Sequence, residues 1–425
     1  MPDRDPAPLD TTSIPRARMP DLTLSFLAEG YDFIREHCAY HGSDAFEARL
    51  LGRRTVFCYG EEAARMFYEP GRFTRRGAVP SFAFKLLQDE GSVATLDGEA
   101  HRARKALFMS FMTPVRLDAV ADAAASRLRD RLAAYPDGAA LHDVVRDVLC
   151  RVACDWVGVP ASPDEVASLA EEAGAMIDEA GSVGPANWIA RLRRHRSEEM
   201  LAHLAREARA GRLELPEGSP AAAFVAWRGP DGAPLDDAVV AVELLNLIRP
   251  IVAIARFVTF AALALHEHPA AREAIRAHEE GQLGRFVSEV RRTTPFFPAI
   301  AGRVRTPFAW RGRAFEEGEL VVLDLYGTDR DPRLWRDAAR FDPARFHGRE
   351  PGAYDLIPQG GGDPFSGHRC AGEWLTIVVM EAMTAVLARE AVWRVPEQDL
   401  SVSLTDMPAL PKSGLVLADV RLEAG

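Results

Sequence analysis

The sequence contains little cysteine, and its five cysteines are scattered along 425 residues. An odd and sparse count does not make a disulfide framework, and it suits a reducing compartment in which one thiol is kept for chemistry. Basic residues are also fewer than acidic ones: the chain has 51 Lys and Arg and 62 Asp and Glu, which gives a net charge of -11. An acidic total argues against a broad nucleic-acid-binding surface, so we expect no nucleic-acid partner.

Long hydrophobic runs and a secretory signal are also lacking. The most apolar stretch, residues 250–265, is interrupted by Arg256 and is shorter than the ~20 residues that span a bilayer. The first residues are polar and rich in proline, without the charged and then apolar layout of a signal peptide. We therefore expect a cytoplasmic protein without a membrane span.

Hydrophobic residues make up 48% of the chain and charged residues 27%, which is the balance of a folded globular protein. Strand-like alternation occurs in a hairpin at residues 44–59, again at 300–325, and in the tail, where 401–407 and 414–424 alternate. Helical periodicity dominates elsewhere, and helices are predicted at 100–112, 117–135, 141–157, 165–180, 186–210, 238–268, 269–280, 282–293 and 370–389.

No linker or repeat interrupts the body of the chain. The sequence therefore predicts an α+β fold that is predominantly helical. Residues 1–20, which include five prolines, are expected to form an extended N-terminal arm, and residues 21–425 a single domain.

One cysteine stands apart, because Cys370 follows a glycine-rich segment at the predicted start of a helix. A helix N-terminus and the basic neighbours His368 and Arg369 favour a thiolate over a thiol, and a thiolate is the ligand that a haem iron requires. The alternative is an ordinary packed thiol. A phosphate-binding loop is excluded, because the glycines lack the Gly-Lys-Ser or Gly-Lys-Thr ending. The other cysteines are interpreted as structural: Cys38, Cys58, Cys150 and Cys154.

Two further motifs precede this cysteine. Glu289 and Arg292 lie three apart on a predicted helix, so they share a face and can pair. Residues 341–346, Phe-Asp-Pro-Ala-Arg-Phe, end 24 residues before Cys370. In this order and spacing the three motifs resemble the cytochrome P450 superfamily, over nearly the whole chain. The resemblance implies haem b between a distal and a proximal helix beside small β-sheets, Cys370 as the axial iron ligand, and Arg345 as a partner of the Glu289–Arg292 pair.

The segment before the cysteine departs from the common pattern of that superfamily, Phe-x-x-Gly-x-Arg-x-Cys-x-Gly. Asp363, Ser366 and His368 stand where the pattern has Phe, Gly and Arg. The difference points away from ordinary monooxygenases and towards one branch of the superfamily.

The predicted distal helix, residues 238–268, carries Arg249 and Pro250 in apolar surroundings, and no acid precedes Thr259. A buried guanidinium without a partner is costly, and the residues one turn away are uncharged. A substrate carboxylate would pair with it in a bidentate manner. The alternatives for Arg249 are a haem propionate, a distant acid, or a side chain that reaches water. Pro250 removes a backbone N–H and is expected to kink the helix, whereas Arg256 is interpreted as structural.

The Arg-Pro pair and its surroundings resemble the fatty-acid peroxygenase branch of the superfamily, as do residues 95–105. The resemblance implies an oxidoreductase that uses H2O2 directly on fatty acids, with no redox partner required. Members hydroxylate the α or β carbon, or decarboxylate the substrate to a terminal alkene. Arg249, with Pro250, then anchors the substrate carboxylate near the iron, and that carboxylate serves as the general acid and base.

The resemblance also assigns contacts to the haem. His101 and Lys105 lie four apart on one helical face and match positions that bind a haem propionate, although a solvated basic face is the alternative. His368 and, as a weaker candidate, Arg75 are further propionate ligands. Gln359 is a candidate hydrogen-bond donor to the cysteine sulfur.

Ala94, Phe296 and Phe297 are the candidate residues of the substrate pocket. Several members of the branch carry Gln or His where this chain has Ala94, and a His there often accompanies alkene formation. Alanine therefore favours hydroxylation. Phe296 and Phe297 either line the pocket or belong to the core.

Other functions stay open on the sequence. They are a peroxide-dependent decarboxylase, a peroxide-using enzyme for a different carboxylate, a reductase-driven monooxygenase, and a non-catalytic haem protein that senses a fatty acid or a gas. The missing acid-Thr pair argues against the reductase-driven enzyme. The lack of an output module in the sequence argues against the sensor.

Overall fold

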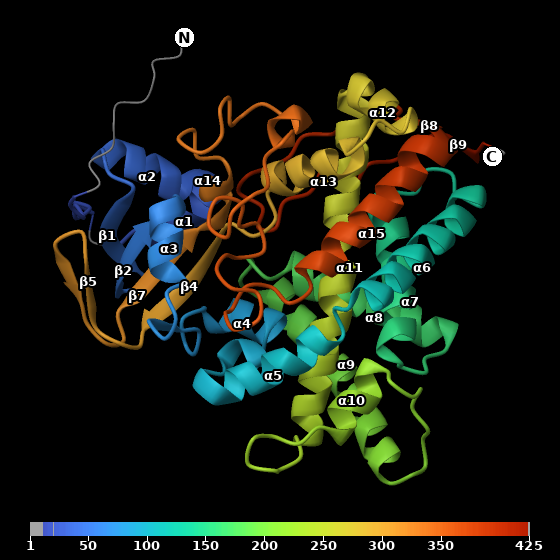
Figure 1. Ribbon diagram of the computed structural model, residues 1–425, viewed down its shortest axis with the longest axis horizontal. Coiled ribbons are helices and arrows are strands. Elements are labelled where there is room, and N and C mark those ends of the chain that lie inside the picture. The colour runs from blue at the N-terminus through green and yellow to red at the C-terminus, as the bar shows by residue number, and fades with distance from the viewer. Residues whose placement is uncertain (1–11, 20, 424–425) are drawn as a thin grey trace.

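The computed structural model describes residues 12–19 and 21–423. Helices make up most of the molecule, and a small β-region lies at one side, beside α1 and α2 (Figure 1). The α-helices are α1 (Thr23–Glu29), α2 (Phe33–His41), α3 (Glu61–Phe67), α4 (Ser81–Leu87), α5 (Gly98–Ser110), α6 (Pro114–Ala133), α7 (Leu141–Val157), α8 (Pro163–Asp178), α9 (Pro185–Arg209), α10 (Pro220–Ala226), α11 (Asp237–Glu267), α12 (Pro269–Arg276), α13 (Gln282–Thr293), α14 (Leu325–Asp329) and α15 (Glu373–Ala385).

The strands lie near the two ends of the chain and in the segment after α13. They are β1 (Ala45–Leu50), β2 (Arg53–Cys58), β3 (Phe73–Thr74), β4 (Ala299–Val304), β5 (Phe308–Trp310), β6 (Arg313–Phe315), β7 (Leu320–Asp324), β8 (Ala391–Arg394) and β9 (Ala418–Leu422). Short helical turns complete the elements: η1 (Gly30–Asp32), η2 (Val93–Thr95), η3 (Pro343–Phe346) and the π-helical η4 (Val386–Glu390).

The largest sheet has the strand order β1-β2-β7-β4-β3, and it joins segments that are far apart in the sequence. β1 and β2 form the predicted hairpin, with Ala45 opposite Cys58 and Leu50 opposite Arg53. β7 then adds to β2 in parallel, and β4 pairs antiparallel with β7. The N-terminal hairpin is therefore held by strands from the last third of the chain.

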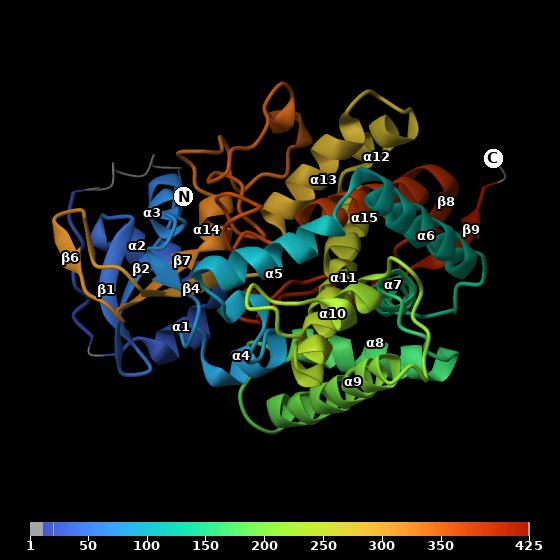
Figure 2. The ribbon, with the colours of Figure 1, turned by 60° about the horizontal axis from the view of Figure 1, so that its bottom comes forward.

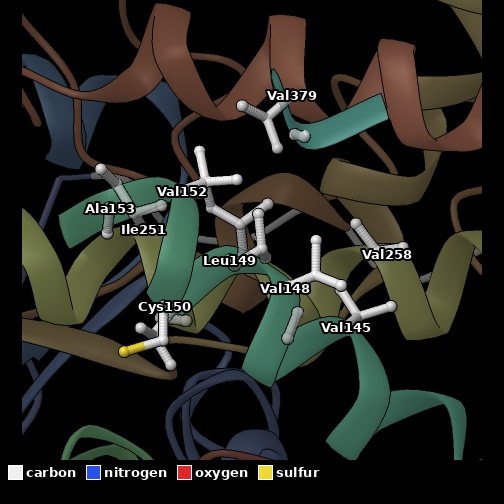
Figure 3. Close-up of a cluster of buried hydrophobic side chains, with 14 of the residues drawn as sticks. Val145, Val148, Leu149, Cys150, Val152, Ala153, Ile251, Val258 and Val379 are labelled. Carbon is white, nitrogen blue, oxygen red and sulfur yellow. The ribbon is translucent and has the colours of Figure 1, made fainter. Parts of the chain in front are cut away.

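The core centres on α11, which passes through the middle of the helical part (Figures 1 and 2). α7 and α9 pack against it, and α15 packs against another side. Figure 3 shows apolar side chains of α7 together with Ile251 and Val258 of α11 and Val379 of α15. The apolar stripe of α7, with buried residues recurring every three to four positions, explains why this segment is helical and why its boundaries match the prediction.

α11 has 31 residues, which is longer than the apolar stretch noted in the sequence, because the helix continues on both sides of residues 250–265. Its length and composition would allow it to cross a membrane, but 78% of its most apolar window is buried inside the protein. That burial is typical of a core helix.

Two predictions of secondary structure are wrong. The helix expected to begin at Cys370 begins at Glu373, with Gly372 at its N-cap. Residues 401–407 form no strand, since Val402 makes only an isolated bridge with Pro411. A proline has no backbone N–H to offer, so it does not extend a ladder.

Most of the predicted extended arm, residues 1–11 and 20, lies outside the described residues. The described part runs beside β1, where Glu47 N–H donates to the Pro15 carbonyl and Ala17 N–H donates to the Glu47 carbonyl. The division into an arm and one domain stays a prediction.

Candidate active site

Cys370 lies in the loop before α15, and the structure holds it through Gln359. The Cys370 N–H donates to the Gln359 carbonyl at 3.0 Å, and Gln359 Nε2 contacts Sγ at 3.9 Å. Gln359 also donates to Thr376 Oγ1 at 3.0 Å, which fixes its amide. Gln359, proposed as a donor to the sulfur, thus lies beside it.

The glycine-rich loop before the cysteine packs against Tyr68. Gly360 and Gly362 have positive φ angles of 91° and 81°, which favour glycine. A Cβ on Gly360 would lie 2.9 Å from Tyr68 Oη, so a side chain there would collide with the ring. These glycines allow the close approach that positions the cysteine.

Of the two predicted causes of thiolate formation, the basic sequence neighbours are wrong. Burial raises the pKa of the Cys370 thiol, and the nearby ammonium of Lys105 is the main influence that lowers it. Arg369 is paired with Glu373 at 2.6 Å, and burial lowers the pKa of His368 to about 2, so neither sequence neighbour offers a free positive charge. Gly372, the N-cap residue of α15, hydrogen-bonds to the thiol through its backbone N–H and lowers the pKa of Cys370, so the helix N-terminus acts on the cysteine as predicted.

An ion-pair network under the cysteine was missed by the sequence analysis. Glu373 accepts from both Arg369 and Arg291, and Arg291 also donates to Gln359 Oε1 at 3.2 Å. The only signal in the sequence was an acid three residues after Cys370, whose partner could be identified only once α13 was placed beside α15.

Four basic side chains gather on the other side of the loop. The rings of His101 and His368 have centroids 4.1 Å apart, and Lys105 Nζ donates to the Arg369 carbonyl. Arg75 donates to the Ala301 carbonyl at 2.9 Å. Burial lowers the pKa of His101 to about 4, and it also lowers the pKa values of Lys105 and Arg75.

Within residues 12–19 and 21–423, none of these four groups pairs with a carboxylate. Buried basic groups need an anion, and a haem carries two propionates. A thiol that can ligate iron lies next to them. The residues present therefore fit a haem, with Cys370 as the iron ligand and the basic cluster holding the propionates.

Arg249 extends from α11 and is buried, with 8% of its surface exposed. Its Nη2 donates to the carbonyl of Leu87 at the end of α4, and its Nε has no hydrogen-bond partner. No carboxylate in the described part of the chain pairs with it. Burial, together with the nearby charge of Arg194, lowers its pKa to about 9, while Cys370 acts in the opposite direction.

Arg194 of α9 holds the same end of α4 and was not singled out in the sequence. It donates to the Leu86 carbonyl at 2.7 Å and to the Gln88 carbonyl at 3.3 Å, and it pairs with Glu198 at 2.7 Å. The guanidinium groups of Arg194 and Arg249 together thus bind three consecutive backbone carbonyls at the end of α4.

Ala94 lies in η2, and the turn is tied to α11 through a buried acid. Glu243 accepts from the Val93 N–H at 2.8 Å and from Arg104 at 2.7 Å. Burial raises the pKa of Glu243. The signal in the sequence was an acid at the start of an apolar helix run, which needs a basic partner, but nothing local identified Arg104.

Phe296 and Phe297 pack together, with ring centroids 4.5 Å apart, and Phe296 contacts Phe257 of α11 at 5.1 Å. Phe296 is buried and Phe297 is partly exposed. The carbonyls of Pro295 and Phe296 accept from Tyr31 Oη. Core packing therefore accounts for Phe296, and the pocket role of both residues stays a proposal.

The distal helix lacks a free acid-Thr pair, as the sequence indicates. Thr259 Oγ1 donates to the Ala255 carbonyl at 2.7 Å and contacts His142 Nδ1 at 3.3 Å. Arg256 pairs with Asp178, which agrees with a structural role. The Arg-Pro pair is left as the distinctive feature of α11.

The predicted pairing of Glu289 is confirmed. Arg292 forms two hydrogen bonds with the carboxylate, at 2.7 and 2.8 Å, and Arg345 of η3 donates to Oε1 at 3.1 Å. Glu289 and Arg292 are fully buried. We call these three residues the Glu289 cluster.

Solved structures show the same fold along nearly the whole chain. Cytochrome P450EX alpha (CYP152N1), determined with myristic acid, is 40% identical, with a TM-score of 0.93 and coverage of 97% of this chain and 100% of that one. Cytochrome P450 OleT, determined without a ligand, is 34% identical, with a TM-score of 0.93 and coverage of 97% and 100%. Cytochrome P450SP alpha (CYP152B1) in complex with (R)-ibuprophen is 40% identical, with a TM-score of 0.91 and coverage of 95% and 100%.

Matches to curated sequences are weaker. The family model for cytochrome P450 matches residues 283–417. A beta-amyrin 28-monooxygenase of Saponaria officinalis is 32% identical, but the chain spans only 15% of its length. A putative cytochrome P450 120 of Synechocystis is 24% identical over 92% of this chain and 93% of that protein. Because its fold, cysteine loop and Glu289 cluster agree with these matches, the chain belongs to the cytochrome P450 superfamily of haem-thiolate oxidoreductases, and within it to the CYP152 peroxygenases.

Proposed function

We propose that this protein is a peroxygenase that uses H2O2 to hydroxylate fatty acids at the α or β carbon, with Arg249 anchoring the substrate carboxylate. The observation that carries the proposal is the guanidinium of Arg249, buried in α11 without a carboxylate partner in the described part of the chain. A carboxylate binds a guanidinium more strongly than a backbone carbonyl does, because the bond is charge-assisted and bidentate. A fatty acid therefore displaces Leu87 as the partner of Arg249.

The bound haem supplies the oxidising chemistry, with its iron ligated by Cys370 and its propionates held by His101, Lys105, His368 and Arg75. The protein holds the substrate in position and, through the bound carboxylate, provides for proton transfer. Arg249 would hold the acid group in a fixed position, so the carbons next to the carboxylate would be the ones placed for oxidation, which would account for α or β selectivity. The substrate carboxylate accepts and returns a proton of the peroxide, a role for which α11 offers no acid of its own before Thr259.

Ala94 favours hydroxylation over decarboxylation. An alanine in η2 offers neither a hydrogen bond nor a proton to the substrate, and Phe296 and Phe297 are proposed to complete the apolar wall. Decarboxylation to a terminal alkene is the second candidate. H2O2 as co-substrate without a redox partner, and a cytoplasmic location, belong to the same proposal.

Replacing Arg249 tests the anchor. With H2O2 and a series of saturated fatty acids, Arg249→Ala is expected to lower turnover on the order of 100-fold or more, because a misplaced substrate loses that much rate. Arg249→Lys keeps a charge without the bidentate geometry and should be intermediate. Arg256→Lys, next to Asp178 on the same helix, is the matched control.

Mass analysis of the products distinguishes the candidates. Hydroxy acids support the proposal, and terminal alkenes support the decarboxylase. Product formed only with NADPH and a reductase would point to a monooxygenase. Full activity of Arg249→Ala without any added short carboxylic acid would exclude the anchoring role.

A further inference from the structure

The N-terminal part of α9 exposes large apolar side chains that a water-facing helix seldom carries. Val183, just before the helix, is 62% exposed, and Trp188, Ile189 and Leu192 are 62%, 53% and 65% exposed. Leu192 lies four positions after Trp188 and three after Ile189, so the three side chains share one face of the helix. These four residues, which we call the α9 face, lie together at one end of the helix.

Arginines surround this face. Arg191 and Arg196 are exposed and Arg193 is partly exposed. In the described part of the chain these three form no ion pair, whereas the neighbouring Arg194 is paired with Glu198. Arg193 also lines a hollow with the acidic residues Glu171, Asp178 and Glu179, so the basic character of this side rests mainly on Arg191 and Arg196, in a protein with a net charge of -11.

The position of α9 makes the face accessible. In Figure 2, α9 forms the outer edge of the helical part, with α4 beside it and the core helix α11 further inside. α9 buries its other side through residues that include Ala190 and Arg194. The α9 face is thus the outward side of a helix whose inner side is already packed.

We propose that the α9 face docks on the surface of an anionic lipid bilayer. Trp and aliphatic side chains beside arginines are the composition of helices that lie in a membrane interface. Anionic headgroups would neutralise Arg191, Arg193 and Arg196, while the acidic remainder of the protein is repelled, so this face is the one that turns to the membrane. A second copy of the chain is disfavoured, because a two-fold contact would bring the unpaired arginines of both copies into one interface.

The docked face lies close to the candidate active site. Arg194, on the same helix, donates to the carbonyls of Leu86 and Gln88, and Arg249 donates to the carbonyl between them. α9 would therefore contact the bilayer with its outward side and hold α4, next to Arg249, with its inner side. That an acyl chain enters from the bilayer at this place rests on the proposed function, whereas membrane binding itself does not.

Vesicle sedimentation with the haem-loaded protein tests the proposal. Vesicles of phosphatidylcholine with added phosphatidylglycerol should bind the protein, and binding should weaken as salt rises. Trp188 emission should shift to shorter wavelength on binding, and Trp188→Phe should remove the shift while retaining binding. No fatty acid or H2O2 is present, so a failure of the proposed function does not affect the result.

Matched variants separate the apolar contribution to vesicle binding from the electrostatic contribution. The double variant Ile189→Ser with Leu192→Ser should bind at least about tenfold more weakly to all vesicles, since each side chain loses its transfer into the interface. Arg191→Gln with Arg196→Gln should weaken binding only to vesicles with phosphatidylglycerol. Val115→Ser on α6 removes another apolar side chain, 81% exposed, and should change nothing.

Three results would overturn the proposal. The first is no sedimentation with any vesicle, and the second is binding by the double variant equal to that of Val115→Ser. The third is a dimer, detected by analytical ultracentrifugation, that Leu192→Ser dissociates, because it would assign the face to a second copy. Haem absorbance and circular dichroism of each variant establish that it is folded.

Discussion

Arg249 and Arg194 illustrate how the fold holds a buried cation when no acid is close enough to neutralise it. The carbonyls at the end of a helix carry a partial negative charge, so the end of α4 stabilises both guanidinium groups. Arg194 also has Glu198, whereas Arg249 has only the carbonyl. Arg249 is therefore the one that gains most from a ligand carboxylate.

Asp324 is a second buried charge, and it makes stability depend on pH. Its Oδ1 accepts from the Gly327 N–H at 2.6 Å, but its buried Oδ2 has no partner. Burial raises its pKa from 3.8 to about 7. Because the pKa is raised on folding, the contribution of Asp324 is fully present below about pH 4 and is lost as pH rises through 7.

Asp324→Asn removes this titration while keeping an oxygen for the Gly327 N–H. We expect the urea midpoint of the wild type to fall relative to that of the variant between pH 4 and 7, with a constant difference above pH 7. The full effect is of order a few kcal/mol. Asp118→Asn on the exposed side of α6 is the control. Parallel pH profiles of wild type and Asp324→Asn would contradict the prediction.

At the scale of elements, the Glu289 cluster joins α13 to the loop-rich segment that leads to Cys370. Arg345 of η3 donates to the Arg336 and Arg340 carbonyls as well as to Glu289, so one arginine organises a stretch with little regular structure. Arg292 adds bonds to the Asp329 and Ala338 carbonyls. The cysteine loop depends on this cluster for its position.

Removing the acid leaves two arginines buried without their partner. Glu289→Ala is expected to destabilise the protein by roughly 3–5 kcal/mol and to lower the haem content on purification. Glu289→Gln keeps the shape and should fall in between, while Glu273→Ala on the exposed side of α12 should have no effect. The urea midpoint and the haem-to-protein absorbance ratio measure both effects. An unchanged midpoint in Glu289→Ala would show that the cluster does not hold the loop.

At the scale of the whole molecule, the proposed haem site draws on residues from the first and the last third of the chain. Arg75 follows β3, His101 and Lys105 belong to α5, and Cys370 comes just before α15. A haem bound there links the β-region to the helical core. Its loss should lower the melting temperature of the entire protein, because its ligands span that boundary.

Lys105→Met is expected to stabilise the protein when haem is absent and to weaken its binding of haem when haem is present. Without haem, the variant loses a buried cation that has no acidic partner and should melt at a higher temperature than the wild type. With haem it loses a propionate partner, so transfer of haem to an acceptor protein should be faster. Met is chosen because it has a similar length and no charge. Haem transfer that is no faster from Lys105→Met than from the wild type would exclude Lys105 as a propionate ligand.

The sequence determined local features of the protein better than it determined long-range contacts. Helical periodicity placed α7 and α13 at their observed boundaries, because a buried stripe every three to four residues is a local property. The resemblance of the motifs around Glu289, Arg345 and Cys370 to known proteins indicated the family, and an Arg-Pro pair in an apolar helix led to the prediction that Arg249 needs an anion. Each of these inferences can be made along the chain without knowing which segments pack together.

Tertiary structure decided which distant groups neutralise one another. Whether His368 or Lys105 favours the Cys370 thiolate depends on burial and on Arg369 being taken up by Glu373, neither of which is local. The partners of Glu243 and Arg249 come from segments some 140–160 positions away, Arg104 and Leu87. Charge pairing acts through space, so only the packed chain determines which buried ion is left without a partner of opposite charge.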